Sequence, residues 1–153
     1  MLSVNKNILY YEFRFSHLST AKSGSKVAPH KPLLLLSVID LIETGIINSS
    51  IIELSDALVE SFKRNADIYA SGIEHFKPNI GMPFFYMRSE PFWELIPKVD
   101  GVTPVANTIP SLRKHYSHAR IDDELYQLLQ DPASAQPLRR VLIETYLDRK
   151  SVG

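Results

Sequence analysis

The stretch that decides the fold is Ala28–Gly45, which reads APHKPLLLLSVIDLIETG. Its second part is apolar on almost every side, which predicts a helix over residues 32–44 that is buried at the centre of the domain. Pro32 suits the first helical position, where a missing N–H costs nothing, and the final glycine suits the stop. His30 and Lys31 are therefore expected at the positive end of this helix.

This helix start has two interpretations. Backbone N–H groups without helical partners, together with two cationic side chains, favour the binding of an anion, and a phosphate is the obvious one. The same proline-bracketed segment can also be a plain loop that leads the chain into a core helix. The sequence by itself leaves both open.

The composition is that of one globular domain. A chain of 153 residues can bury a core, and we expect residues 1–150 to form a single domain, with 151–153 as a tail or the start of a linker. No apolar run approaches the length of a membrane span, and the N-terminus lacks the apolar part of a secretory signal, so we expect a cytoplasmic protein without a membrane partner. The absence of cysteine excludes disulfides, thiol catalysis and zinc sites built on thiolates.

The net charge is zero, but the charges are segregated along the chain. Residues 1–31 sum to +4 and residues 98–120 to +3, whereas residues 32–62 sum to −5 and residues 121–148 to −4. If the two basic segments meet in space, they form a bounded positive patch that attracts a polyanion. The alternative is an ordinary solvated surface.

The remaining pattern predicts a mainly α domain around the central helix, with one small β-hairpin. Further helices are expected over residues 5–17, over residues 55–69, after Asp122 as a cap, and from Asp131-Pro132 onwards. The aromatic-rich runs 84–88 and 92–96 flank a Ser-Glu-Pro turn and predict the hairpin, over about 84–96. In the first helix, the residues expected to face the core are Ile8, Leu9, Phe13 and Phe15.

Common catalytic motifs are not found in the sequence. It has no Gly-rich phosphate loop, no His-Glu-x-x-His and no Gly-x-Ser-x-Gly. His115 and His118 are three residues apart and could share a helical face, but no third metal ligand is evident. A phosphate-facing role beside Arg113, Lys114 and Arg120 is the stronger interpretation, and we expect neither catalysis nor a cofactor in this chain.

A second feature is the run Met82–Tyr86, which reads MPFFY. One interpretation is a strand that enters the core with its phenylalanines packed inward. The other is a small apolar hollow near Pro83 that is open to solvent.

Several motifs occur in one order along the chain: APHKPLLLL at 28–36, Pro83-Phe84, Phe92-Trp93, ARIDDEL at 119–125, LLQDP at 128–132 and LIETY at 142–146. This series resembles the sulfur-binding domain at the N-terminus of bacterial McrA-type restriction endonucleases, which bind phosphorothioated DNA. The resemblance spans nearly the whole chain. It implies a module that binds duplex DNA with sulfur in place of a non-bridging phosphate oxygen and so targets a restriction endonuclease.

The resemblance also implies roles for particular residues. His30 and Lys31, with Pro29, would approach the modified linkage, and Pro83, with Phe84, would form an apolar cavity for the sulfur. The chain departs from the family at Met82, where a Tyr is common, and at Tyr86, where a small residue is expected. The residues expected to contact neighbouring phosphates or bases are Lys22, Ser23, Ser25, Lys26, Asn107, Ser111, Arg113, Lys114, His115 and His118.

Full-length members of that family carry a C-terminal His-Asn-His (HNH) nuclease domain, and a divalent metal would belong to that domain alone. No such motif is visible in this chain, so we expect either an excised domain or a separate reader, with homodimerisation left open.

The implied chemistry is physically consistent. A phosphorothioate keeps its negative charge, while its sulfur is larger, more polarizable and more weakly hydrated than oxygen. A protein that recognises it must offer cations or N–H groups to the charge and an apolar surface to the sulfur.

Three other functions are compatible with the sequence. The domain could recognise a methylated base, which requires a pocket for a flipped base. It could be a protein-interaction domain of a restriction system, with Phe84, Phe85 and Trp93 as the partner patch. It could also be a metal nuclease, for which no ligand set is visible.

Overall fold

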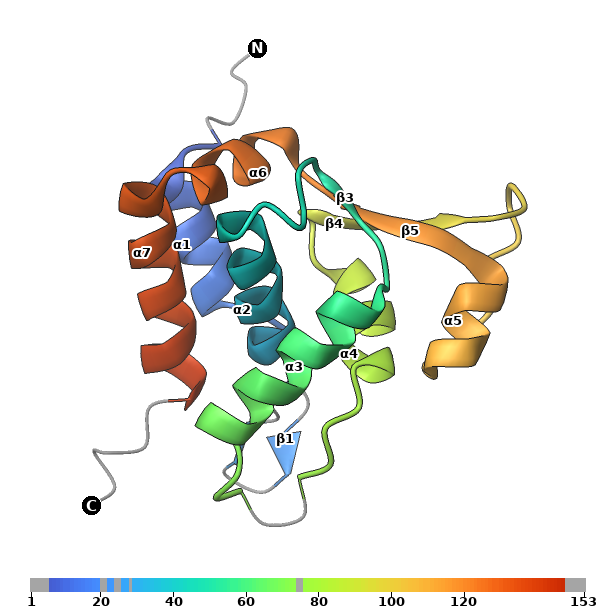
Figure 1. Cartoon of the computed structure of the whole chain (residues 1–153), viewed down its shortest axis with the longest axis horizontal. Helices are drawn as coiled ribbons and strands as arrows, with labels where there is room; N and C mark the ends of the chain where they lie inside the picture. Colours follow the sequence, from blue (N-terminus) through green and yellow to red (C-terminus); the bar gives the residue numbers. More distant parts are fainter. Residues whose placement is uncertain (1–5, 20–21, 24–25, 28, 74–75, 148–153) are drawn as a thin grey trace.

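The computed structural model describes residues 6–19, 22–23, 26–27, 29–73 and 76–147, and for 22–23 and 26–27 it describes the backbone alone (Figure 1). The elements are, in chain order, α1 (Ile8–Ser16), β1 (Lys22–Ser23), β2 (Lys26–Val27), α2 (His30–Glu43), β3 (Ile51–Ile52), α3 (Asp56–Tyr69), α4 (Gly81–Tyr86), the 3₁₀ turn η1 (Met87–Ser89), β4 (Trp93–Pro97), α5 (Ile109–His115), β5 (Tyr116–Ile121), α6 (Asp123–Gln130), α7 (Pro132–Leu142) and the π-helical turn η2 (Ile143–Leu147). The predicted mainly α class is confirmed.

The central helix α2 is buried on nearly every side, as the sequence predicts. Figure 1 shows it between α1 and α7 on one side and α3 and α4 on the other. The helix begins two residues earlier than expected, because Pro29 is its N-cap and Pro32 occupies the third helical position. A proline is tolerated there, since the N–H groups of the first turn have no partner within the helix. Gly45, with a φ of 81°, follows its end.

A polar cluster fixes α2 against its neighbours. The Asn65 amide of α3 donates to Ser37 Oγ at 3.1 Å and to Asp40 Oδ2 at 2.9 Å, both on α2. Arg139 of α7 donates to Asp40 Oδ1 at 2.8 Å and to Glu43 Oε1 at 2.7 Å. Hydrogen bonds to charged groups at these lengths set the rotation of α2 within its apolar surroundings.

The predicted inward face of α1 is partly wrong. Tyr11 and Phe15 are fully buried, whereas Leu9 is 68% and Phe13 is 55% exposed. The Tyr11 hydroxyl donates to Asp122 Oδ2 at 2.7 Å, which satisfies its polar end and lets its ring enter the core. Asp122 precedes α6 as predicted, but its carboxylate binds Tyr11 and not the α6 backbone.

The predicted hairpin is wrong in its first strand. Residues 84–88 belong to α4 and η1, and β4 instead pairs antiparallel with β5, which in turn pairs with β3. The alternation that a strand requires is missing, because Phe84 and Phe85 are both fully buried. Gly81, Phe84 and Phe85 face inward at helical spacing, while Met82 and Tyr86 are exposed four residues apart.

Among the described residues, no helix combines the length and apolar character needed to cross a membrane.

The contact between α4 and the start of α5 yields a test of the fold. A Cβ at Gly81 would collide with the Asn107 carbonyl oxygen and lie 2.9 Å from Thr108 Cα, both of them backbone atoms. We expect Gly81→Ala to lower the free energy of unfolding by about 1–3 kcal/mol, the usual cost of overpacking. Urea titration would measure the loss. Gly72→Ala is the matched control, because a Cβ there meets nothing within 4 Å, and equal stability of the two variants would contradict the close approach.

Candidate nucleic-acid interface

The start of α2 lies against the segment that contains α4. His30 Nε2 lies 3.4 Å from the Lys77 carbonyl oxygen, and its ring packs on Phe76 with the centroids 4.8 Å apart. The Lys31 ammonium reaches Ser89 and Glu90 just after α4. The cationic helix start therefore packs against α4 and the residues that flank it on both sides.

His30 is held in a half-buried position. Its loss of solvation by burial lowers the pKa of the imidazole, and the hydrogen bond to the Lys77 carbonyl opposes this shift only in part. A carbonyl oxygen can only accept, so Nε2 carries the proton. In the neutral ring Nδ1 is then an acceptor, and only the imidazolium can donate to an anion from that nitrogen.

Lys31 differs from its predicted role as a free cation. The residue is only 7% exposed, and its ammonium forms a 2.7 Å ion pair with Glu90 Oε2. The same carboxylate oxygen accepts the Ser19 backbone N–H at 2.9 Å, and Ser89 Oγ accepts from Lys31 at 3.0 Å. Sequence reasoning missed Glu90, because nothing local links it to a lysine 59 residues away.

The apolar part of the candidate site is the outward face of α4. Met82 is 38% and Tyr86 is 42% exposed, while Pro83 and Phe84 are buried beneath them. Pro83 is therefore not an open wall of a hollow, whereas Phe84, although almost fully buried, contributes to the lining of a pocket. Pro29 is buried as well. The two exposed residues are those at which the chain departs from the pattern of the family.

Two further predicted residues lie beside α4. The backbone of Asn107 contacts Gly81, and Ser111 lies in the first turn of α5. The Ser111 hydroxyl completes a capping box, because it lies 2.7 Å from Thr108 Oγ1 and 3.2 Å from the Thr108 backbone nitrogen. Its polar atom is thus partly committed to the helix end.

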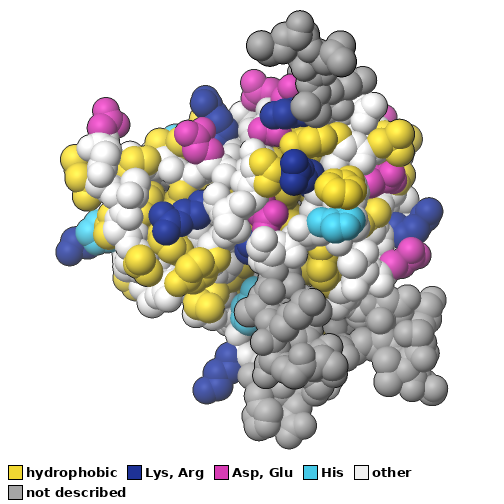
Figure 2. All heavy atoms as spheres, turned by 180° about the vertical axis from the view of Figure 1, so that it is seen from behind, with side chains coloured by type: hydrophobic (Ala, Val, Ile, Leu, Met, Phe, Trp, Pro, Cys, Tyr) yellow, Lys and Arg dark blue, Asp and Glu magenta, His cyan; other side chains and the backbone are white. Residues whose placement is uncertain are grey.

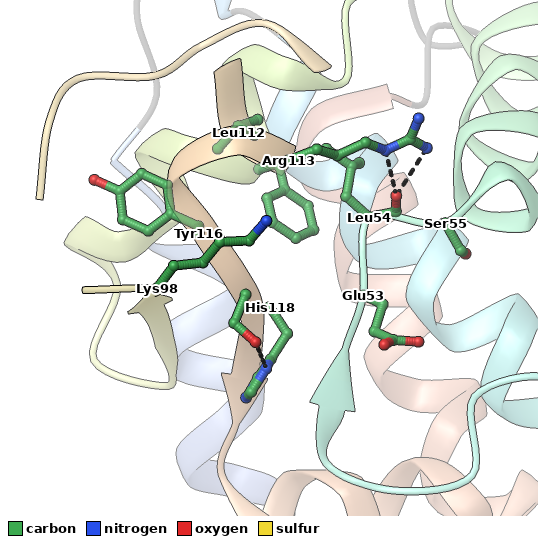
Figure 3. Close-up of a pocket in the computed structure, with 10 residues that line it drawn as sticks. Glu53, Leu54, Ser55, Lys98, Leu112, Arg113, Tyr116 and His118 are labelled. Carbon is green, nitrogen blue, oxygen red and sulfur yellow. Dashed lines mark hydrogen bonds between the residues drawn. The ribbon is translucent and has the colours of Figure 1, made fainter. Parts of the chain in front are cut away.

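Phe84 of α4 also lines a pocket of about 300 Å³, together with residues of α5, of β5 and of the segment after β3 (Figure 3). Arg113 borders it, but its guanidinium donates to the Leu54 carbonyl at 2.9 and 3.1 Å and pairs with Asp56 at 3.2 Å. His118 Nδ1 forms a 2.9 Å hydrogen bond with Ser117 Oγ. Lys98 also lines the pocket and points into it in Figure 3, although the sequence analysis did not select it.

The prediction that His115 and His118 share a helical face is wrong. α5 ends at His115, and His118 lies in β5. In the part of the chain that the structure describes, no group of three or more His, Asp or Glu side chains could hold a metal ion.

The cations do not merge into one patch on the face seen in Figure 2, where Lys and Arg side chains stand apart, with acidic and hydrophobic side chains between them. In Figure 1, β1 lies at the lower edge of the molecule and α5 at its right edge. Lys114 is exposed on α5. The side chains of Lys22, Ser23 and Lys26, and the whole of Ser25, lie outside the described residues.

The fold has close counterparts among solved structures. The sulfur binding domain of SprMcrA complexed with phosphorothioated DNA matches 96% of this chain and 91% of that chain, with a TM-score of 0.68 and 18% identity. The sulfur binding domain of ScoMcrA complexed with phosphorothioated DNA matches 89% of this chain and 86% of that chain, with a TM-score of 0.66 and 17% identity. This chain has the sulfur-binding-domain fold.

A longer ScoMcrA structure, with a sulfur binding domain and an SRA domain complexed with phosphorothioated DNA, matches 84% of this chain but only 40% of that chain, with a TM-score of 0.54 and 20% identity. No protein-family model and no curated protein sequence matches the chain. The resemblance stated from the sequence motifs is thus supported by the sulfur-binding-domain fold, at an identity too low to transfer individual residues.

The environment of His30 in this sulfur-binding-domain fold predicts how stability changes with pH. Because its pKa in the folded protein lies below the ordinary value of 6.5, the unfolded chain binds the proton first as pH falls. Stability should therefore decline from about pH 6.5 downwards, until the depressed pKa is passed. Melting temperatures at pH 7.5 and 5.5 should differ more in the wild type than in His30→Gln. The other four histidines are common to both proteins, so an equal pH response would refute this assignment.

Proposed function

We propose that this chain is a non-catalytic DNA-binding module that recognises phosphorothioate linkages in duplex DNA. The observation that supports it most is the packing of the α2 start against α4 and the residues on either side of it, within a fold whose solved counterparts are complexed with phosphorothioated DNA. On α4 itself, Met82 and Tyr86 are exposed. The proposed site thus combines a positive helix end with apolar side chains.

The negative charge of the linkage would bind at the start of α2. His30, when protonated, donates from Nδ1, and the helix end adds its positive dipole. Binding an anion there favours proton uptake by His30, so affinity should rise as the pH falls toward its depressed pKa.

The sulfur would contact the side chains of Met82 and Tyr86. A thioether and an aromatic ring are polarizable, and sulfur loses little hydration on contact with them. An oxygen at the same place would lose strong hydrogen bonds to water. The preference expected from one such atom is about 1–3 kcal/mol, the size of one well-placed contact.

Further contacts would extend along the duplex. Arg113, Lys114, His115 and His118 are suited to neighbouring phosphates, as are Lys22, Ser23, Ser25 and Lys26, while Asn107 and Ser111 are suited to bases. We place residues 1–150 in one recognition domain of a cytoplasmic restriction system. An HNH nuclease domain would supply cleavage.

The proposal is tested with two short duplexes that differ by one sulfur. We expect the modified duplex to bind at least fivefold more tightly, because about 1 kcal/mol corresponds to that ratio. Fluorescence anisotropy at a fixed salt concentration measures both affinities, and a methylated duplex serves as competitor. Equal affinity for the two duplexes would end the proposal, and preferential competition by the methylated duplex would favour recognition of a modified base.

Variants separate the two parts of the site. We expect Met82→Ala and Tyr86→Ala to reduce the preference for sulfur severalfold while leaving affinity for the unmodified duplex nearly unchanged, because they remove only apolar contacts. We expect His30→Ala to weaken binding of both duplexes. Ile68→Ala, at an exposed position on α3, and His17→Ala, after α1, are the matched controls. A preference for sulfur that survives in both α4 variants would contradict this division.

A further inference from the structure

Glu90 is a buried carboxylate that joins three segments of the candidate site. Its side chain is 5% exposed, and Oε2 accepts from the Lys31 ammonium at 2.7 Å and from the Ser19 backbone N–H at 2.9 Å. Lys31 belongs to the start of α2, Ser19 lies just ahead of β1, and Glu90 follows α4 and η1. This one side chain therefore connects the α2 start to the chain just after α4 and to the residue ahead of β1.

The pairing removes Lys31 from the set of cations that DNA can use. Its ammonium side chain is 8% exposed, and its charge is balanced by a carboxylate in direct contact. A phosphate near the α2 start would meet both charges of the pair at similar distances, so their effects largely cancel. Moving the ammonium out to the phosphate would leave Glu90 buried without its counter-charge, which is strongly unfavourable.

We propose that Glu90 withholds Lys31 from the DNA backbone and so sets the affinity for unmodified DNA at a low level. The inference rests on the proposed function and concerns regulation of the same site. A free cation attracts a phosphate and a phosphorothioate alike, since both carry one negative charge. Pairing this cation with Glu90 lowers the affinity for modified and unmodified DNA alike and leaves the apolar contacts unaffected.

Such restraint matters because unmodified linkages vastly outnumber modified ones in a genome. A DNA-binding protein with many free cations is sequestered on ordinary DNA through counterion release. The zero net charge of the chain agrees with the same restraint.

The test is Glu90→Gln, which keeps the shape and an acceptor for Ser19 but removes the counter-charge. Without this counter-charge, the flexible four-carbon side chain of Lys31 can extend its ammonium toward a phosphate of the DNA backbone. We expect affinity to rise severalfold at low salt for both duplexes of the sulfur pair. The plot of log affinity against log salt should steepen by about 0.9, the increment of one phosphate contact. Ser89→Ala removes a neutral partner of the same ammonium and should change neither quantity.

The double variant Lys31→Gln/Glu90→Gln makes the test independent of whether the single variant folds. If the charges of Lys31 and Glu90 cancel in their effect on DNA, removing both should leave the slope of log affinity against log salt at its wild-type value. The preference for sulfur should also be unchanged. A slope shallower by about 0.9 would mean that Lys31 contacts DNA in the wild type, and it would overturn the inference.

A folded Glu90→Gln variant with the wild-type slope would overturn it as well. Failure of the proposed function itself would be visible separately, as equal binding of the two duplexes by the wild-type protein.

Discussion

The burial of α2 on nearly every side is the constraint on which the rest of the structure depends. A fourteen-residue helix with leucine or isoleucine facing every direction can be stable only if other elements surround it completely. α3, α4, α6 and α7 contact it from different directions, and the polar cluster of Ser37, Asp40, Asn65 and Arg139 fixes its rotation. The start of α2 is consequently held at the edge of the core, with His30 half-exposed and Lys31 enclosed.

The sequence made α2 predictable because all-round apolarity requires a buried position whatever the neighbours are. It also predicted α3 over residues 55–69, from the four-residue spacing of Leu54, Leu58 and Phe62, and the structure adds that the Ser55 hydroxyl caps this helix by accepting the Leu58 N–H at 3.1 Å. The 84–88 run was misassigned because a short aromatic segment fits a strand and a helix equally well until its partner is known. The partner of β4 is β5, which begins more than 15 residues further along the chain, beyond the reach of local patterns.

The candidate site was predictable in its location and less so in its chemistry. Local motifs identify the α2 start and the 82–86 run, and the fold brings them together. They do not identify Glu90 as the partner of Lys31. They also do not show that residues 82–86 form a helix that buries Phe84 and exposes Met82 and Tyr86. Both facts depend on tertiary packing, because the charge state of a site and the orientation of a side chain are set by neighbours that are distant in sequence.

Under the proposed function, this arrangement separates two tasks that are often combined. Charge cannot distinguish a phosphorothioate from a phosphate, so extra cations add affinity without adding discrimination. Discrimination must come from the difference in hydration and polarizability between sulfur and oxygen, which only apolar contacts can detect. The ion pair between Lys31 and Glu90 therefore reduces the affinity that comes from charge, while the exposed Met82 and Tyr86 keep the apolar contacts that discriminate. At the modified linkage itself the proposed charge contact is that of His30, whose burial disfavours its cationic form until an anion is bound beside it.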